Sequence, residues 1–264
     1  VGSEMCIRDR SNLAPWFKNK DNHKKYDWYV FNSHWSYEKF RMMFHIPTHK
    51  SLVIKNAIDK IEPGNLNYNK GDPIKLIYTS TPWRGLNVLL GAMQLVKNPL
   101  VSLDVYSSTQ IYGDRFKNAN DKNYIDLYEQ AKTIPNVNYI GYKPNEFIKE
   151  NLKNYHMFVY PNTWEETSCI AAIEAMAAGL YTVVTDYGAL YETCTDFAVY
   201  TPYEKDFVKL AKTFASVIET VATHLHDDHI KEHLQLQIDY MNRFYSWEKR
   251  AKTWNRFLEG IVNA

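Results

Sequence analysis

The sequence has little of what would assign it to several specialised protein classes. Its three cysteines (Cys6, Cys169 and Cys194) are widely spaced. They support neither a disulfide framework nor a zinc site, so we expect a reducing, cytoplasmic environment. No apolar run approaches the roughly 18 residues of a membrane span, which leaves peripheral association with the inner face of a membrane as an open alternative. The formal net charge is +1, so the sequence offers no basic excess for nucleic-acid binding.

Two catalytic signatures are also missing or misplaced. A hydride-transfer enzyme would carry G-x-G-x-x-G after its opening strand, and residues 79–86 lack it. Residues 224–229 (HLHDDH) match the H-x-H-x-D-H pattern of metallo-β-lactamases. That motif follows a strand, whereas these histidines lie in a late helical region. We interpret them as a solvated helix junction, and we expect no bound metal or cofactor.

The sequence does contain a regular alternation of short apolar runs with helical patterns. Hydrophobic residues make up 45% of the chain, enough for a buried core. We expect strands at residues 27–32, 51–54, 74–79, 101–106, 137–140, 157–160 and 181–185. We expect helices at residues 34–44, 86–96, 124–133, 146–152 and 168–178, a polar loop at 107–123, and mostly helix from residue 204 onward. Alternating strands and helices predict a doubly wound, Rossmann-like α/β fold with a parallel sheet.

One linker divides the predicted elements. Residues 61–73 hold two prolines, two glycines and three asparagines, a composition typical of linkers. We therefore place the end of one domain and its linker at residues 11–72, and a second domain with closing helices at residues 73–264. Residues 1–10 (VGSEMCIRDR) fit neither helix nor strand, and we interpret them as non-native. The chain is then expected to be a fragment of a longer protein.

Ligands of doubly wound sheets bind outside the carboxyl ends of the strands, which directs attention to three loops. The first contains Ser80, Thr81 and Arg84 and opens a helix. A helix N-terminus with an arginine suits a diphosphate; the alternative is an ordinary solvated arginine. The second loop contains the candidate base-binding residues, which are Gly141, Tyr142 and Lys143. By itself it is equally compatible with a plain strand-to-helix turn.

The third loop and its helix carry two glutamates. Glu166 lies in the loop, and Glu174 lies in an alanine-rich helix expected to pack on the sheet. A lone carboxylate there would be costly to bury without a partner, unless Glu174 points to solvent. Carboxylates accept hydrogen bonds from vicinal hydroxyls of a ribose or hexose. An anion is expected at the N–H groups of the helix start, which are those of Thr167, Ser168 and Cys169.

At these residues the chain resembles the retaining GT-B glycosyltransferases of family 4, the group 1 glycosyl transferases. The run EETSCIAAIEAMAAG is similar to the family's E-x7-E signature, with Glu166 and Glu174 as its glutamates. VVTDYGALYE, IYTSTPWRGLNVLL, FNSHWSYEKFRMMFHI, VIKNAID and YSWEKRAKTWNRFL resemble other segments of the family. The resemblance covers residues 26–258 and implies that residues 73–264 form a nucleotide-sugar-binding GT-B C-terminal domain, preceded by a remnant of the N-terminal domain.

The resemblance also implies roles. Glu174 would bind the ribose of a nucleotide-diphospho-sugar, Glu166 would contact the donor sugar, and Arg84 would hold the diphosphate. Transfer would be metal-independent, of hexosyltransferase type, and directed to a glycan, lipid or other acceptor hydroxyl, as in polysaccharide biosynthesis. Two departures from the family are Ser80-Thr81 in place of a Gly-Arg pair and Ala57 in place of glycine. Because most of an N-terminal domain is missing, we expect the fragment to be inactive alone. A non-catalytic nucleotide-sugar-binding module and a GT-B-type epimerase are the alternatives.

Overall fold

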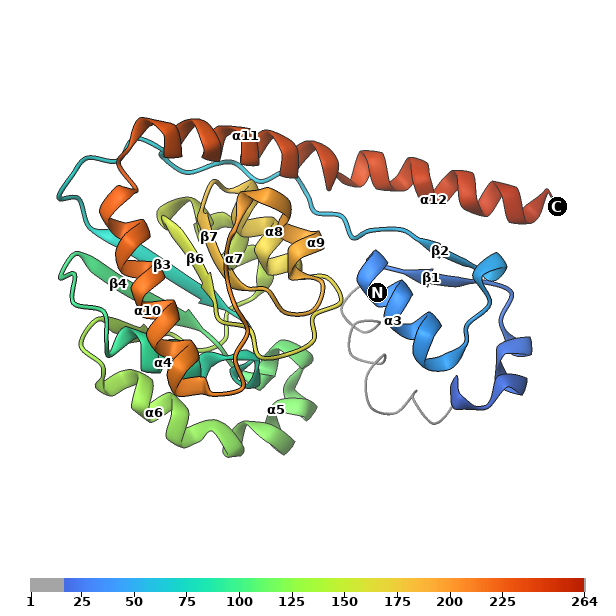
Figure 1. Cartoon of the computed structure of the whole chain (residues 1–264), viewed down its shortest axis with the longest axis horizontal. Coiled ribbons are helices and arrows are strands. Elements are labelled where there is room, and N and C mark those ends of the chain that lie inside the picture. The colour runs from blue at the N-terminus through green and yellow to red at the C-terminus, as the bar shows by residue number, and fades with distance from the viewer. Residues whose placement is uncertain (1–16, 264) are drawn as a thin grey trace.

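The structure is a computed structural model, and it describes residues 17–263. The interpretation of residues 1–10 as non-native lies outside this range. Two sheets organise the chain (Figure 1). The smaller one pairs β1 with β2 in parallel and carries α3 beside it. The elements of this first part are η1 (Lys20–Lys25), β1 (Tyr29–Phe31), α3 (His34–Phe44), η2 (Thr48–Lys50) and β2 (Ser51–Val53).

The larger sheet has six parallel strands in the order β5-β4-β3-β6-β7-β8. Its strands are β3 (Ile74–Thr79), β4 (Val101–Tyr106), β5 (Val137–Tyr139), β6 (Met157–Tyr160), β7 (Tyr181–Thr185) and β8 (Val199–Thr201). Successive strands run outward from β3 through β4 to β5, and the chain then returns to β6 on the other side of β3. This reversal is the topological switch point at which doubly wound sheets bind ligands. The predicted parallel, Rossmann-like sheet is confirmed.

Helices cover both faces of this sheet. They are α4 (Leu86–Met93), α5 (Asp114–Asn120), α6 (Ile125–Thr133), α7 (Asn145–Asn151), α8 (Ile170–Ala177), α9 (Leu190–Cys194), α10 (Phe207–His224), α11 (Asp228–Phe244) and α12 (Trp247–Val262). Short 3-10 turns are η3 (Pro82–Arg84), η4 (Thr109–Tyr112), η5 (Asp121–Tyr124), η6 (Leu152–Asn154) and η7 (Thr195–Phe197). α10 packs against α4, and α11 packs against α8 on the opposite face (Figure 1).

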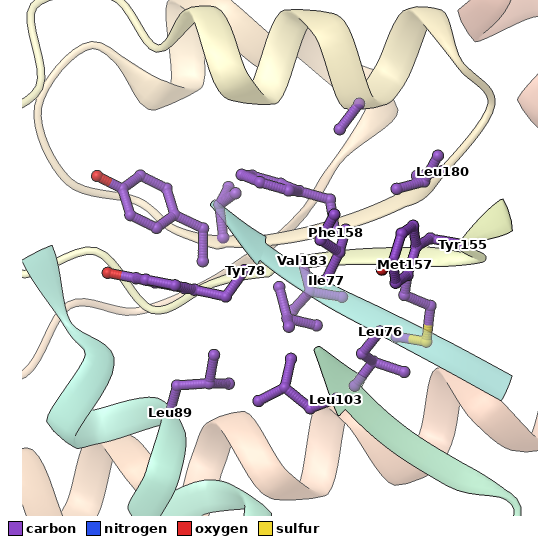
Figure 2. Close-up of a cluster of buried hydrophobic side chains, with 14 of the residues drawn as sticks. Leu76, Ile77, Tyr78, Leu89, Leu103, Tyr155, Met157, Phe158, Leu180 and Val183 are labelled. Carbon is purple, nitrogen blue, oxygen red and sulfur yellow. The ribbon is translucent and has the colours of Figure 1, made fainter. Parts of the chain in front are cut away.

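The core lies on both faces of the central strands. Figure 2 shows Leu89 and Leu103 below the sheet and Phe158 and Leu180 above it, each at most 1% exposed. Burying one such side chain contributes roughly 1.5–3 kcal/mol relative to exposure. Two-sided coverage explains why β6 is buried at every position, since a parallel strand covered by helices has no solvent face.

Sequence and structure differ at three short elements. The predicted polar loop at 107–123 is wrong, because it contains α5 flanked by η4 and η5. β8 and the five-residue α9 were not anticipated. These pieces are too short to show a periodicity of their own, and contacts with the rest of the fold define them. Helix α3 matches its predicted bounds, with Ser33 capping through its side chain.

The helical C-terminal part was predicted correctly, from α10 through α12. The histidines of residues 224–229 lie at the junction of α10 and α11, where His224 Nδ1 is 3.1 Å from Asp227 Oδ2. That location agrees with the interpretation as a helix junction. Within residues 17–263, no helix combines the length and the apolar character that crossing a bilayer requires.

Candidate functional site

The loops that follow β3 and β6 touch at the carboxyl edge of the sheet. Gly85 makes this contact possible, because its φ of 103° lies in the left-handed region that disfavours side chains. A Cβ added there would lie 2.0 Å from the carbonyl oxygen of Pro161. The chain therefore needs glycine for both its backbone conformation and its close approach, and this approach brings Arg84 to the loop that carries Glu166.

Arg84 and Glu166 form a buried ion pair at that contact. Arg84 Nη1 donates to Glu166 Oε1 at 2.8 Å, and the side chains are 17% and 4% exposed. Tyr160, fully buried on β6, donates to the same Oε1 at 2.7 Å. Burial opposes the charge on Arg84, but Glu166 keeps the pKa of the guanidinium above its ordinary value. Two groups that were selected separately from the sequence are thus direct partners.

The backbone of Glu166 is fixed by the turn after β7. Ala189 N donates to Glu166 O at 2.7 Å. Gly188, with φ 68°, packs so closely that an added Cβ would lie 2.5 Å from Glu166 N. This turn lies within the VVTDYGALYE run, which extends from β7 into α9, so that run supports the position of the first glutamate.

Glu174 lies in the middle of α8 and is buried, with 6% exposed. This excludes the alternative in which it points to solvent. Asn145, the first residue of α7, donates its Nδ2 to Glu174 Oε1 at 3.3 Å. Burial raises the pKa of Glu174 to about 7, against the lowering effects of the Asn145 hydrogen bond and of the Lys149 charge. The two glutamates therefore have different partners among residues 17–263: Glu166 contacts a buried cation, whereas Glu174 has only an amide within hydrogen-bond distance.

The start of α8 differs from its predicted position. The helix begins at Ile170, with Cys169 as N-cap in extended conformation and no side-chain cap. Thr167 and Ser168 are buried loop residues rather than helix residues. Of the three predicted N–H groups, only that of Cys169 lies at the helix boundary. Their contact with an anion stays a prediction.

The second loop, between β5 and α7, reaches the site through α7. Tyr142 is 39% exposed, and the Lys143 ammonium lies 5.4 Å from the centre of the Phe147 ring. Two residues after Lys143, Asn145 contacts Glu174. The loop containing Gly141 is thus connected to α8, although its role in base binding stays a prediction.

Three buried polar atoms at this edge have no hydrogen-bond partner among residues 17–263: Thr81 Oγ1, Arg84 Nε and Ser107 Oγ. They belong to the loops after the neighbouring strands β3 and β4. Buried polar atoms are nearly always hydrogen-bonded, so unsatisfied atoms gathered at one sheet edge indicate a polar ligand. Ser80, beside Thr81, is partly buried on the same loop.

Sequence reasoning missed one contact of the ion pair. Tyr112, at the end of η4, accepts a hydrogen bond from Arg84 Nη2 at 2.9 Å. The aromatic residues in 107–124 were a signal, because a solvated polar loop does not need Tyr112, Phe116 and Tyr124.

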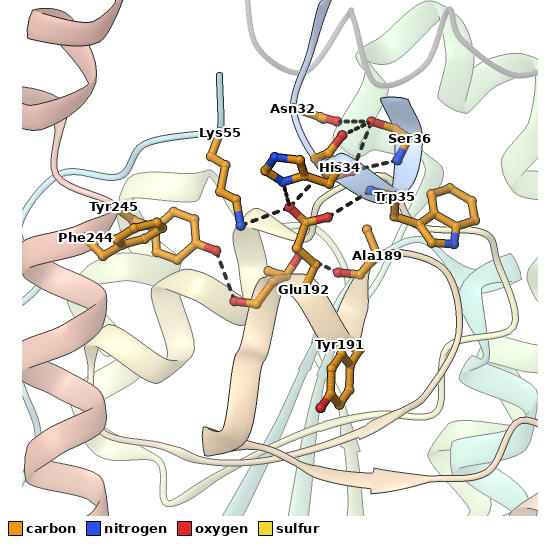
Figure 3. Close-up of polar contacts among 12 residues, drawn as sticks. Asn32, His34, Trp35, Ser36, Lys55, Ala189, Tyr191, Glu192, Phe244 and Tyr245 are labelled. Carbon is orange, nitrogen blue, oxygen red and sulfur yellow. Dashed lines mark hydrogen bonds and ion pairs between the residues drawn. The ribbon is translucent and has the colours of Figure 1, made fainter. Parts of the chain in front are cut away.

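A second missed cluster surrounds Glu192 on α9 (Figure 3). Its carboxylate accepts from the backbone N–H groups of His34 and Trp35 at 3.0 and 2.9 Å and pairs with Lys55 Nζ at 2.9 Å. Burial tends to raise the pKa of Glu192, but these donors outweigh it and lower the pKa to about 2. Glu192 thus caps α3 and joins the first part of the chain to the large sheet.

A pocket of about 400 Å³ lies between α3 and the loop after β6. It is largely aromatic and adjoins the backbone on both sides of Glu166. Its lining residues are Trp35, Lys39, Phe40, Met43, Phe44, Thr163, Trp164, Glu165, Thr167 and Tyr187. Lys39 pairs with Glu165 across it.

The family model for glycosyl transferases group 1 matches residues 61–228, which include Arg84, Glu166 and Glu174. The chain belongs to the group 1 glycosyl transferases. Its fold is that of GT-B glycosyltransferases. No curated protein matches the sequence.

Three solved structures illustrate how this group 1 glycosyltransferase relates to others. A glycosyltransferase from Rickettsia africae has a TM-score of 0.72 at 16% identity, over 96% of this chain and 67% of that one. The pneumococcal O-GlcNAc transferase GtfA, in complex with UDP and GlcNAc, has a TM-score of 0.71 at 13% identity, over 96% of this chain and 48% of that one. HepE of Anabaena, in complex with UDP and glucose, has a TM-score of 0.67 at 16% identity, over 95% of this chain and 70% of that one. The chain therefore spans between about half and 70% of these proteins.

Proposed function

We propose that this group 1 glycosyltransferase chain carries the donor site of a retaining enzyme that transfers a hexose from a nucleotide-diphospho-sugar. The observation that supports this most is the buried Arg84–Glu166 pair at the carboxyl edge of the sheet, with the buried carboxylate of Glu174 on the adjoining helix. A cation for a diphosphate and two carboxylates for sugar hydroxyls are the groups that such a donor needs.

Each group has a proposed role. Glu174 accepts hydrogen bonds from the ribose, and Arg84 holds the diphosphate and stabilises it as it leaves. The N–H groups of Thr167, Ser168 and Cys169 assist, as do the loop groups of Ser80 and Thr81. The segment Gly141, Tyr142 and Lys143 contacts the base. No metal is required in this proposal, because the guanidinium and the backbone N–H groups neutralise the departing phosphate.

Glu166 contacts the donor sugar in this proposal. The hydrogen bonds that Glu166 already accepts explain why it would prefer a sugar-bearing donor. Its Oε1 accepts from Arg84 and Tyr160. When the diphosphate competes for Arg84, the buried ion pair between Arg84 and Glu166 is weakened, and weakening a buried ion pair is costly without a replacement donor. The hydroxyls of the sugar supply that replacement, so Glu166 favours a complete nucleotide sugar over a bare nucleotide.

In the transfer step, the bond between the anomeric carbon and the diphosphate oxygen breaks, and the diphosphate leaves with the electron pair. The acceptor hydroxyl oxygen bonds to the same face of that carbon, so configuration is retained. Its proton leaves with the diphosphate. We further propose that the acceptor is a glycan or a lipid and that the reaction belongs to polysaccharide biosynthesis. The proposed location is the cytoplasm, with peripheral association at the inner face of the membrane.

Isothermal titration calorimetry tests the donor site. We would titrate UDP-glucose and UDP-GlcNAc first, because two of the similar structures contain UDP, followed by GDP-mannose and ADP-glucose. We expect at least one nucleotide sugar to bind and Glu174→Ala to weaken that binding at least tenfold, because an acceptor for ribose hydroxyls is lost. Glu129→Ala is the matched control, since Glu129 is exposed on α6.

If no donor binds, or if Glu174→Ala binds as tightly as the unchanged chain, the donor site is refuted. We also expect the 264-residue chain to show little turnover alone. Donor binding that persists without transfer in a longer chain would favour the binding-module alternative. Nuclear magnetic resonance of the product anomer tests retention.

A further inference from the structure

We propose that Tyr112 is an additional donor-site residue, whose hydroxyl donates a hydrogen bond to the diphosphate that Arg84 holds. This inference rests on the proposed function and extends it to a residue on η4, outside the loops after β3 and β6. Tyr112 and Arg84 are adjacent, with Arg84 Nη2 donating to the Tyr112 hydroxyl oxygen at 2.9 Å.

The chemistry of this contact fixes the direction of the hydroxyl. A guanidinium has five N–H donors and no acceptor. The Tyr112 oxygen therefore accepts from Arg84, and its own proton is directed to a different acceptor. The adjacent positive charge polarises the O–H bond, which strengthens donation to an anion. An oxygen that binds Arg84 and Tyr112 together must accept two hydrogen bonds, and the positive charge of Arg84 favours an anionic oxygen in that position.

The ring of Tyr112 is held in place by aromatic packing. It stacks on Trp83 with centroids 5.9 Å apart and an interplanar angle of 26°. Phe116 meets it edge-on at 5.3 Å. Because Trp83 and Arg84 are consecutive, one loop supplies both the platform for the ring and the partner for its hydroxyl. This arrangement keeps the hydroxyl beside the cation without depending on the hydrogen bond alone.

The segment that carries Tyr112 is also anchored at both ends. Asp121 Oδ1 accepts from the backbone N–H of Thr109 at 3.1 Å, from the Thr109 hydroxyl at 3.1 Å and from the Tyr128 hydroxyl at 2.9 Å. One carboxylate thus ties the beginning of the segment to its end and to α6. A segment fixed in this way positions a side chain, as a binding site requires.

Unsatisfied atoms at the same edge of the sheet support an anion at this position. Arg84 Nε and Ser107 Oγ are buried and have no partner among residues 17–263. Ser107 starts the segment that carries Tyr112. A diphosphate has several non-bridging oxygens, enough to accept from Arg84, Tyr112 and Ser107 at the same time.

Calorimetry with Tyr112→Phe tests the proposal, because the substitution removes only the hydroxyl and keeps the stacked ring. The probes are UDP-glucose, uridine and inorganic pyrophosphate. We expect affinity for UDP-glucose and pyrophosphate to fall about tenfold, the effect of losing a hydrogen bond to a charged group, with uridine unchanged. Tyr191→Phe is the matched control, since Tyr191 is 62% exposed on α9.

A double substitution separates direct contact from orientation of Arg84. In an Arg84→Met background, Tyr112→Phe should weaken pyrophosphate binding again. If the second loss disappears there, or if Tyr112→Phe binds UDP-glucose like the unchanged chain, the proposed contact is overturned while the donor site stands. If the unchanged chain binds none of the four nucleotide sugars and no pyrophosphate, both the donor site and this contact are refuted. Pyrophosphate binding that depends on Tyr112, without nucleotide-sugar binding, would retain the contact and refute the donor.

Discussion

Glu166 and Glu174 are both buried, but their surroundings give them opposite electrostatic situations. Glu166 pairs with Arg84, whereas in the described part of the chain Glu174 has only an amide donor within hydrogen-bond distance. The sequence indicated a costly carboxylate at Glu174, because its helix is otherwise apolar. It did not indicate that Arg84 would meet Glu166, since 82 positions separate them in the chain and only the approach at Gly85 joins their loops.

The raised pKa of Glu174, about 7, predicts opposite pH trends for stability and for donor binding. In the unfolded chain the carboxyl group of Glu174 ionises near its ordinary pKa of 4.5. The native state therefore holds the proton more tightly, and this contribution to stability is complete below 4.5 and is lost as pH rises through about 7. Ribose binding uses the ionised form, so affinity for UDP-glucose should rise about tenfold from about pH 6 to about pH 8.

Calorimetry across this pH range and thermal unfolding in parallel provide the measurement. Glu174→Gln should flatten both profiles, because it cannot ionise. The group faces Asn145, Lys149, Asp59 and Glu146, and Lys149→Met should raise the pKa further. A UDP-glucose affinity that is constant between about pH 6 and about pH 8 would contradict the role of Glu174.

At the scale of elements, the segment from η4 to η5 contains a helix that the periodicity of apolar residues in the sequence did not predict. Its residues looked like a polar loop, yet α5 forms there. A seven-residue helix is marginal by itself. Asp121 connects its C-terminal end to Tyr128 on α6, and Phe116 packs on Tyr112 and on Trp83 of the first loop. These contacts with α6 and with the first loop stabilise α5.

The contact between the loops after β3 and β6 predicts a large cost for Gly85→Ala. The substitution forces a left-handed alanine, which costs about 1–2 kcal/mol, and adds a clash with the Pro161 carbonyl. We expect more than about 2 kcal/mol of destabilisation by urea unfolding, together with weaker UDP-glucose binding as Arg84 shifts.

Gly71→Ala isolates the backbone term, because Gly71 has φ 99° but nothing within 4 Å of an added Cβ. Gly71→Ala should lower the free energy of unfolding only by the cost of a left-handed alanine, without the additional cost of a clash. Equal destabilisation by the two substitutions would show that the approach to Pro161 is not tight.

At the scale of the whole molecule, α12 and α9 connect the first part of the chain to the large sheet. Arg250 on α12 donates its Nε to Asn56 O at 3.3 Å, and Phe257 meets Trp28 edge-on at 5.4 Å. Glu192 adds the cap of α3 (Figure 3). These contacts position α3 opposite the loop after β6, and so they shape the aromatic pocket beside Glu166.

We predict that Phe257→Ala loosens the first part of the chain without unfolding the large sheet. The lost ring contact is worth about 0.5–1.5 kcal/mol, which corresponds to local opening rather than global unfolding. Hydrogen exchange measured by mass spectrometry should show faster exchange in β1 and α12, about threefold to tenfold, and unchanged exchange in β3 and β6. Leu258→Ala is the control, because Leu258 is 50% exposed. Faster exchange throughout both sheets would refute the local role.

The sequence by itself determined the class of fold and singled out Arg84, Glu166 and Glu174 as candidate site residues. Strand–helix alternation dictates a parallel sheet, because only crossover connections join parallel strands, and an apolar helix makes Glu174 an expensive carboxylate. The tertiary structure alone decided which groups meet. The Arg84–Glu166 pair, the Tyr112 contact and the Glu192 cap join residues that lie between 28 and 158 positions apart. Such contacts follow from strand order and loop packing, and local pattern contains no information about either.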